Sequence, residues 1–373
     1  MGFFGFFSSL IDRVVDAVDV QLDFEDEQNL IGYFNNGKEV ELFHEALCLE
    51  NNYKINRLMK NIATTTEGVV IRIDLYKDVD IDRLCYCLQL IPTHITRIHL
   101  NVWGLFRGKA RIDFAQFLVV IVAIPAHITD VVYSHPDFYN MSLEHAIQLV
   151  QTFPHALSKL TFLSCNLARM NDLALFLPSL LFFSQLKSLS LMWNALGERR
   201  DLNAVMAAIP ENIEHLSFDG CSLLMLPSHI SLFIDGLKKT PSWIKSLDLR
   251  GNGLKYLSLE QLKELEGALP YLESIYLTSV DIPGVEEQRG ALRKIFPNIR
   301  RVVVDENYET LIAEMSLMEQ TNTAIKYGFK VEVPSLLNQC AFFIRPKQEQ
   351  LGIADAKQSF IPADLYARLS TLS

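Results

Sequence analysis

Cysteine and histidine are the side chains of this chain best suited to act as nucleophiles, general bases or metal ligands. The 373 residues include 6 cysteines and 9 histidines. Cys85 and Cys87 are too close together for the usual zinc-binding pair, and no second pair follows them. His94 and His127 lie in similar sequence contexts, which repetition of a sequence unit explains better than a metal pair does. We therefore expect neither a metal nor a cofactor.

Motifs for catalysis are also absent from the sequence. There is no glycine-rich phosphate loop, no HExxH and no GxSxG. Cys340 has no histidine after it with which it could form a nucleophilic pair. We therefore predict no catalytic residues and a protein that is not an enzyme.

Charge and composition exclude two further classes of function. A net charge of −10 argues against a general nucleic-acid binder, which needs a basic face. The apolar run 117–124 is ended by Pro125, far short of the roughly 20 residues that span a bilayer. Few cysteines in a chain of this length indicate a reducing compartment, so we predict a cytoplasmic location.

A strand pattern recurs along most of the chain. In IKSLDLRGNGL, residues 244–254, Leu247 and Leu249 alternate as in a strand, and Asn252 follows in a turn. Taking Leu247 as the reference position, we find equivalents at Ile73, Ile98, Val131, Leu160, Leu189, Leu216, Ile275 and Val302. The mean step is (302 − 73)/8, about 28.6 residues, which is within the range of leucine-rich repeats.

The fifth residue after the reference completes the pattern L-x-x-L-x-L-x-x-N/C-x-L in four central repeats, where it is Cys165, Asn194, Cys221 or Asn252. These units resemble the long leucine-rich repeats of ribonuclease inhibitors, each of which is a strand, a loop and a helix. Prolines support the resemblance because they stop each helix before the next strand, at Pro92, Pro125, Pro154, Pro210, Pro241, Pro270 and Pro297. Repeats such as IPTHITRI and IPENIEHL also resemble those of effectors secreted by intracellular bacteria such as Legionella.

The resemblance implies an α/β solenoid shaped like a horseshoe, with a parallel concave sheet and convex helices. We divide the chain into a helical N-terminal cap with a degenerate first repeat (1–64), the solenoid (65–305), and an α+β C-terminal cap and tail (306–373). Leu47, Leu49 and Asn52 suggest the degenerate repeat. We also expect at least eight parallel strands, and a helix over 258–269 that begins with a Ser258–Gln261 capping box.

Geometry suggests the role of the asparagine and cysteine positions. Each coil turns sharply after its strand and buries the backbone of that turn, and an inward asparagine can hydrogen-bond those backbone groups. Cysteine is small enough for the same position, so we interpret Cys165 and Cys221 as buried structural thiols.

Residues 3–18 form an amphipathic helical pattern, with Phe3, Phe7, Leu10, Val14 and Val18 on one face. Two interpretations remain open. The segment either caps the apolar end of the first coil, which we favour, or attaches the protein to a membrane surface.

Residues between the inward leucines should line the concave face, because successive strands of a solenoid stack into one sheet. Three large apolar side chains stand there in adjacent coils and predict a protein-binding centre with a polar rim, and Tyr276 lies on the same face. A second, basic-aromatic patch is predicted near Trp103. The proposed protein-binding residues are Leu163, Met192, Trp193, Asp219, Asp248, Arg250, Tyr276, Trp103, Phe106 and Arg107.

The sequence therefore predicts a monomeric, non-enzymatic module that binds another protein through its concave face. If the resemblance to bacterial effectors holds, the chain is secreted into the host cytosol, and its partner is a host protein or another effector. Three alternatives stay open at this point. They are an inhibitor of a partner enzyme, an adaptor recruited to membranes by the N-terminal helix, and an enzyme formed by the C-terminal segment.

Overall fold

The computed structural model describes residues 31–34, 39–43, 55–56, 59–60, 62, 64–75, 79–105, 112–295, 299 and 301–305. The N-terminal segment 3–18, Leu47, Leu49, Asn52 and the predicted cap at 306–373 lie outside these residues. Within them, no helix combines the length and apolarity needed to cross a membrane.

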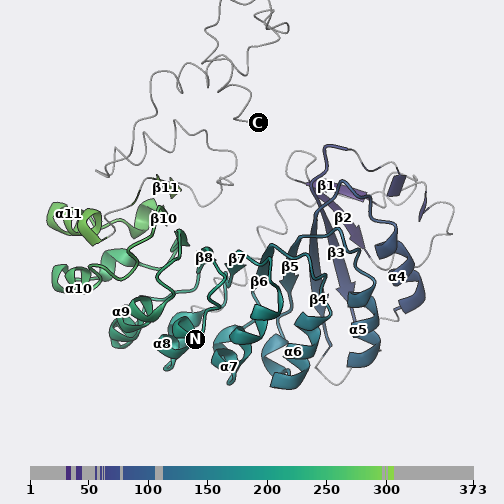
Figure 1. The fold of residues 1–373 in the computed structure, drawn as a ribbon, viewed down its shortest axis with the longest axis horizontal. Coiled ribbons are helices and arrows are strands. Elements are labelled where there is room, and N and C mark those ends of the chain that lie inside the picture. The colour runs from purple at the N-terminus through teal and green to yellow at the C-terminus, as the bar shows by residue number, and fades with distance from the viewer. Residues whose placement is uncertain are drawn as a thin grey trace, which may run out of the picture.

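One curved sheet of eleven strands forms the inner layer (Figure 1). Strands β2 to β11 pair in parallel in chain order, and β1 pairs antiparallel with β2. The ten parallel strands confirm the expectation of at least eight. Their bounds are β1 Ile31–Phe34, β2 Glu39–Phe43, β3 Gly68–Asp74, β4 Arg97–Trp103, β5 Asp130–Ser134, β6 Lys159–Leu163, β7 Ser188–Ser190, β8 His215–Ser217, β9 Ser246–Asp248, β10 Ser274–Thr278 and β11 Arg301–Asp305.

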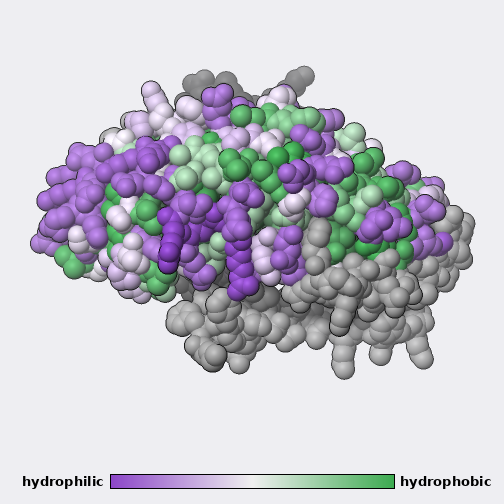
Figure 2. Space-filling view, turned by 90° about the horizontal axis from the view of Figure 1, so that it is seen from below, coloured by the Kyte–Doolittle hydropathy of each residue, from purple (hydrophilic) through white to green (hydrophobic). Residues whose placement is uncertain are grey.

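Helices cover the outer side of the arc (Figure 1). The α-helices are α4 Ile81–Gln89, α5 Phe114–Val122, α6 Leu143–Gln151, α7 Leu173–Phe176, α8 Leu202–Ala207, α9 Ile230–Lys239, α10 Leu259–Glu264 and α11 Glu286–Ile295. Short 3₁₀ helices are η3 Phe138–Asn140, η4 Leu167–Arg169, η5 Leu177–Phe182, η6 Leu196–Glu198, η7 Pro227–His229, η8 Leu254–Tyr256 and η9 Ser279–Asp281. One apolar core fills the space between the two layers from Val40 to Val304. Figure 2 shows the helical side, which is hydrophilic toward α11 and more apolar over α5 to α7.

The register of the first strands corrects one sequence assignment. Ile98 of β4 pairs with Val69 of β3, and not with Ile73, which pairs with Val102. The predicted reference was therefore four residues too late, because Val69 and Ile73 both face the core and fit the same pattern. With Val40 of β2 paired to Val69, the first two steps are 69 − 40 = 29 and 98 − 69 = 29 residues. The repeat is thus more regular than the sequence suggested, and an additional coil begins at β2.

Five of the prolines follow a helix and form the same turn before the next strand. After α4, the carbonyl of Pro92 accepts a hydrogen bond of 3.0 Å from the Ile95 N–H, and Pro125 does the same for Ile128 at 3.1 Å. Pro154, Pro210 and Pro241 make the equivalent bond at 3.2 Å. Each turn buries an apolar residue three positions before the reference, so it sets the direction in which the next strand enters the sheet.

Helix α10 begins as predicted and ends earlier than predicted. The Ser258 side chain accepts from the Gln261 N–H, and the Gln261 side chain accepts from the Ser258 N–H, which completes the capping box. The helix ends at Glu264 rather than at residue 269, and Gly267 follows with a φ of +77°. A left-handed glycine near a helix end stops helical hydrogen bonding. Leu262, Leu265 and Leu269 are still buried, as expected.

Candidate protein-binding face

An asparagine holds the turn after the strand in two of the central coils. The Asn194 amide nitrogen donates to three carbonyls, those of Phe162 (2.8 Å), Leu191 (2.9 Å) and Met192 (3.0 Å), and its oxygen accepts from the Leu167 N–H (3.2 Å). Asn252 makes the same contacts two coils later. Its amide nitrogen donates to the carbonyls of Phe218 (2.8 Å) and Arg250 (3.0 Å), and its oxygen accepts from the Leu223 N–H (3.1 Å). Each asparagine joins two coils, which confirms the predicted role.

Cysteine takes the same position in the other two of the four central coils. The Cys165 thiol donates to the Tyr133 carbonyl (3.3 Å), and the Cys221 thiol donates to the Leu191 carbonyl (2.9 Å). Burial raises the pKa of both thiols to about 12, so they stay protonated and unreactive near neutral pH. They are structural thiols, as predicted.

The residue just before this position adopts a left-handed backbone in all four coils. Its φ is +50° at Ser164, +61° at Trp193, +62° at Gly220 and +67° at Gly251. Glycine takes this conformation freely, whereas a bulky side chain there is an outlier that costs roughly 1–2 kcal/mol. Trp193 thus occupies a place that glycine fills in the next two coils.

The Trp193 side chain lies against the next coil. Its backbone N–H donates to the Asp219 carbonyl at 2.8 Å, and its indole ring covers Gly220. A Cβ added at Gly220 would be 2.6 Å from the indole Cδ1, so no larger residue fits beneath the ring. Among the described residues, nothing accepts a hydrogen bond from the buried indole Nε1.

The predicted apolar centre is assembled, but less exposed than expected. Leu163 and Met192 are neighbours, since the Ser164 N–H donates to the Met192 carbonyl at 3.2 Å, and Trp193 follows Met192. All three side chains are half-buried. The expectation that they stand clear of the surface is therefore wrong, and for Trp193 the reason is that the indole lies over Gly220.

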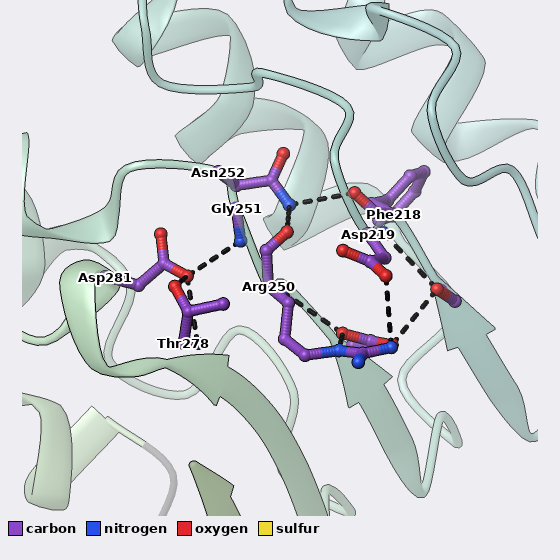
Figure 3. A network of polar contacts seen from close by, with 9 residues as sticks. Phe218, Asp219, Arg250, Gly251, Asn252, Thr278 and Asp281 are labelled. Carbon is purple, nitrogen blue, oxygen red and sulfur yellow. Dashed lines mark hydrogen bonds and ion pairs between the residues drawn. The ribbon is translucent and has the colours of Figure 1, made fainter. Parts of the chain in front are cut away.

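The predicted polar rim is a compact ionic cluster (Figure 3). The Arg250 guanidinium donates to both carboxylate oxygens of Asp248, at 3.0 and 2.8 Å, and lies 3.1 Å from Asp219. Ser217 adds a hydrogen bond to Asp248 at 3.3 Å. Asp219 is only 4% exposed, so it is a buried carboxylate and not a rim residue as predicted. Its partner Arg250 belongs to the following coil, so the sequence pattern of one coil does not reveal this pairing.

Asp281 was missed by the sequence reasoning and stabilises the next turn. This fully buried carboxylate accepts from the Gly251 N–H (2.8 Å), the Gly253 N–H (2.7 Å) and the Thr278 N–H (3.0 Å), and also from the Thr278 hydroxyl (Figure 3). It lies one residue after Val280, the position at which the pattern expects asparagine. The Thr-x-x-Asp spacing of a capping box was the available signal.

Other predicted residues lie further along the concave face. Tyr276 of β10 is half-buried, with the Arg301 guanidinium 5.8 Å from the centre of its ring. Trp103, the last residue of β4, is 47% exposed. Phe106 and Arg107 lie outside the described residues.

A polar group on β2 to β4 was not predicted. Arg72 and Glu41 form an ion pair, and His99 lies one coil further along. Burial, together with the positive charges of Arg72 and Arg97, lowers the pKa of His99 to about 4, so its imidazole is neutral near pH 7. This polar group was missed because the sequence register was four residues too late at Ile73. That register placed Asp74 beside His99, whereas the structure pairs His99 with Val70.

No cluster of His, Cys, Asp or Glu with metal-binding geometry occurs among the described residues. Comparison with solved structures finds the crystal structure of the leucine-rich repeat-containing protein LegL7 from Legionella pneumophila. The match has a TM-score of 0.66 and 23% sequence identity, and it covers 80% of this chain and 92% of that chain. The strand order, the coil length and this similarity all indicate the same fold. The chain has the leucine-rich-repeat fold.

No family model and no curated protein sequence matches the chain. Within the leucine-rich-repeat solenoid, the full sequence pattern and the left-handed turns coincide in the same four coils, which carry Cys165, Asn194, Cys221 and Asn252. These coils also hold the apolar centre and the ionic cluster. The candidate site therefore lies where the leucine-rich repeat is most regular.

Proposed function

We propose that the protein is a non-enzymatic binding module that captures another protein on its concave face over β6 to β9. The observation that carries this proposal is Trp193, a large side chain in a left-handed turn where the next two coils have glycine. Strained residues cluster at functional sites, and tryptophan is the residue type most enriched at binding hot spots. The leucine-rich-repeat fold, whose curved sheet offers an extended surface, supports the proposal.

The anchors of this face are held before the partner arrives. Trp193 packs on Gly220, and Leu163 and Met192 lie on adjacent coils, so few side-chain rotations remain to be frozen on binding. Preorganisation of this kind raises affinity because less conformational entropy is lost. The partner would gain mainly from covering the exposed parts of these three side chains.

The ionic cluster beside the anchors should orient the binding partner more than it attracts it. Arg250 is bonded to Asp248 and paired with Asp219, so the three residues together carry a formal charge of −1. Because the net charge of the cluster is only −1, its long-range field is weak, and we expect the association rate to depend only modestly on salt. The sequence predicted these same three residues as a polar rim around the apolar centre.

We also propose that the chain acts as a secreted bacterial effector in the host cytosol, where it binds a host protein or another effector. Similarity in fold to a Legionella pneumophila protein supports this role. A calmodulin-dependent adenylate cyclase fused to the chain tests it in infected cells. Cyclic AMP should rise with wild-type bacteria and not with a strain that lacks the secretion system. Equal signals in both strains would contradict secretion.

Affinity purification with matched tryptophan variants tests the binding site. Trp193→Gly removes the proposed anchor, whereas Trp243→Gly removes an exposed tryptophan between α9 and β9, away from the concave centre. The partner should be recovered by wild type and Trp243→Gly but lost with Trp193→Gly. If every captured protein is recovered equally by both variants, the concave centre is not the binding site.

A further inference from the structure

Two groups of charged side chains cross the sheet near the start of its strands. In the first group, the Arg97 guanidinium of β4 lies 2.9 Å from the Asp130 carboxylate of β5, and Asp130 also lies 3.9 Å from the Lys159 ammonium of β6. Arg97 pairs in addition with Glu39 of β2 at 3.6 Å. The side chain of Lys159 is 58% exposed and that of Asp130 is 11% exposed, so at this pair solvent meets mainly the cation.

The second group has the same arrangement on the next three coils. Lys187, Glu214 and Lys245 come directly before β7, β8 and β9. The Glu214 carboxylate lies 3.1 Å from the Lys187 ammonium and 2.7 Å from the Lys245 ammonium. Hydrogen bonds from Lys245 and Lys187 lower the pKa of Glu214 to about 2, so this carboxyl is ionised at neutral pH. Glu273 continues the alternation one coil later, since its N–H donates to the Lys245 carbonyl at 2.8 Å.

The alternation of charge is interrupted between β6 and β7. The Lys187 N–H donates to the Ser158 carbonyl at 2.9 Å, and Ser188 pairs in register with Lys159, so the two lysines are on adjacent coils. The serines beside them carry no charge. Within the described part of the chain, each lysine pairs with a carboxylate on the coil that lies away from the other lysine. The pattern of both groups would place one more carboxylate between the lysines, and the described residues do not supply it.

The two lysines belong to the coils that carry the apolar anchors of the proposed binding face. Strands β6 and β7 lie side by side near the middle of the arc (Figure 1). Lys159 and Leu163 share the concave face of β6, and their four-residue separation corresponds to about 13 Å at the rise of a strand. Met192 and Trp193 follow β7, which begins directly after Lys187. A partner segment that contacts the anchors can therefore reach both lysines.

A single protein carboxylate suits the place between these lysines better than a polyanion does. An anion there would accept charge-assisted hydrogen bonds from two ammonium groups and relieve their repulsion across adjacent strands. Lysine has a flexible four-carbon stem, so both ammonium groups can turn toward one carboxylate. A nucleic acid or an anionic membrane carries many negative charges, which the carboxylates on both sides of the lysines would repel. One acidic side chain in a partly apolar segment avoids that repulsion.

We propose that the binding partner places one aspartate or glutamate side chain between Lys159 and Lys187, about 13 Å from the apolar side chain that contacts Leu163 and Trp193. The inference rests on the proposed binding function of β6 to β9 and adds the chemistry of the partner segment. In an extended segment, the acidic and the apolar residue are about four positions apart. The lysines also disfavour a segment that carries lysine or arginine at the acidic position.

Selection of peptides on the full-length protein tests the inference with a defined probe. The probe is a phage-displayed library of random peptides of about 12 residues, which reach about 40 Å when extended. Ser188→Asp supplies a carboxylate from the protein itself, and Ser246→Asp is a matched control because Ser246 has the equivalent position in β9. Wild type and Ser246→Asp should enrich an acidic residue about four positions from an apolar one. Ser188→Asp should lose the acidic preference and keep the apolar one.

Fluorescence anisotropy then measures the acidic contact. One selected peptide is compared with an analogue in which the amide replaces the acid. Wild type should bind the acidic peptide at least about fivefold more tightly than the analogue, and Ser188→Asp should bind the two equally. Lys187→Gln should also reduce the preference, whereas Lys239→Gln, at an exposed lysine that ends α9, should keep it.

Trp193→Gly separates failure of this inference from failure of the proposed function. A wild-type selection without acidic enrichment, or equal binding of the acidic peptide and its analogue by wild type, would overturn the inference. If the selected peptides still lose binding with Trp193→Gly in that case, the binding face stands and only the acidic contact is wrong. If the peptides bind Trp193→Gly as tightly as wild type, the proposed binding face fails and the inference fails with it.

Discussion

Replacing Asn252 by alanine should destabilise the solenoid far more than replacing a surface asparagine. The side chain is fully buried and satisfies the carbonyls of Phe218 and Arg250 and the N–H of Leu223. Alanine leaves the Leu223 N–H without a partner, which costs about 1–3 kcal/mol for a buried group. It also removes one of the two hydrogen bonds at each carbonyl, about 0.5–1.5 kcal/mol apiece, since Phe218 still accepts from the Cys221 N–H and Arg250 from the Gly220 N–H. Allowing for relaxation of the turn, we expect a loss of about 3–5 kcal/mol, a large part of the roughly 5–15 kcal/mol typical of native proteins.

Two further variants make this prediction sharp. Asn166 is exposed and makes a hydrogen bond of 2.7 Å to the Pro136 carbonyl, so Asn166→Ala should lose about 1 kcal/mol. Asn252→Cys should fall between the two alanine variants, because Cys221 donates to a carbonyl from the same position in the preceding coil.

Urea unfolding followed by circular dichroism measures these differences, and hydrogen exchange should show loosening of the two coils that Asn252 joins. Equal losses for Asn252→Ala and Asn166→Ala would refute the role of the asparagine.

Three further predictions follow from the concave face. Gly220→Ala should destabilise the protein by about 1–3 kcal/mol and change the tryptophan fluorescence, because its Cβ would be 2.6 Å from the Trp193 indole; unchanged fluorescence would contradict this packing. Arg250→Ala should cost about 3 kcal/mol by leaving buried Asp219 without its cation, and Asp219→Asn in the same protein should recover part of that loss in thermal unfolding. His99 has a folded pKa of about 4, below its unfolded value near 6.5, so its contribution to stability is full above pH 6.5 and declines as the pH falls to 4. His99→Gln should therefore flatten the stability profile between pH 7 and 4, and an unchanged profile would contradict the burial of a neutral imidazole.

The sequence predicted those features of the fold that depend on a single coil. The spacing of Leu247, Leu249 and Asn252 specified a strand followed by a buried turn, and Ser258 with Gln261 marked the start of α10. These patterns are local, because each is set by the backbone geometry of a few successive residues. The proline turns belong to the same class.

Features that depend on two coils were harder to predict. Val69 and Ile73 are both buried, and only pairing with β4 decides which one is equivalent to Ile98. The exposure of Trp193 was misjudged because Gly220, 27 residues later, provides the surface on which the indole lies. Asp219 was likewise buried by its pairing with an arginine from the following coil.

Calorimetric titration of the captured partner into wild type, Trp193→Gly and Trp243→Gly tests the central claim most directly. Glycine at position 193 matches Gly220 and Gly251, so relief of the left-handed strain should offset the lost packing and keep thermal unfolding close to that of wild type. The account predicts that Trp193→Gly weakens binding by about thirtyfold or more and that Trp243→Gly binds like wild type. Equal affinities for Trp193→Gly and wild type would contradict the assignment of the concave face as the binding site.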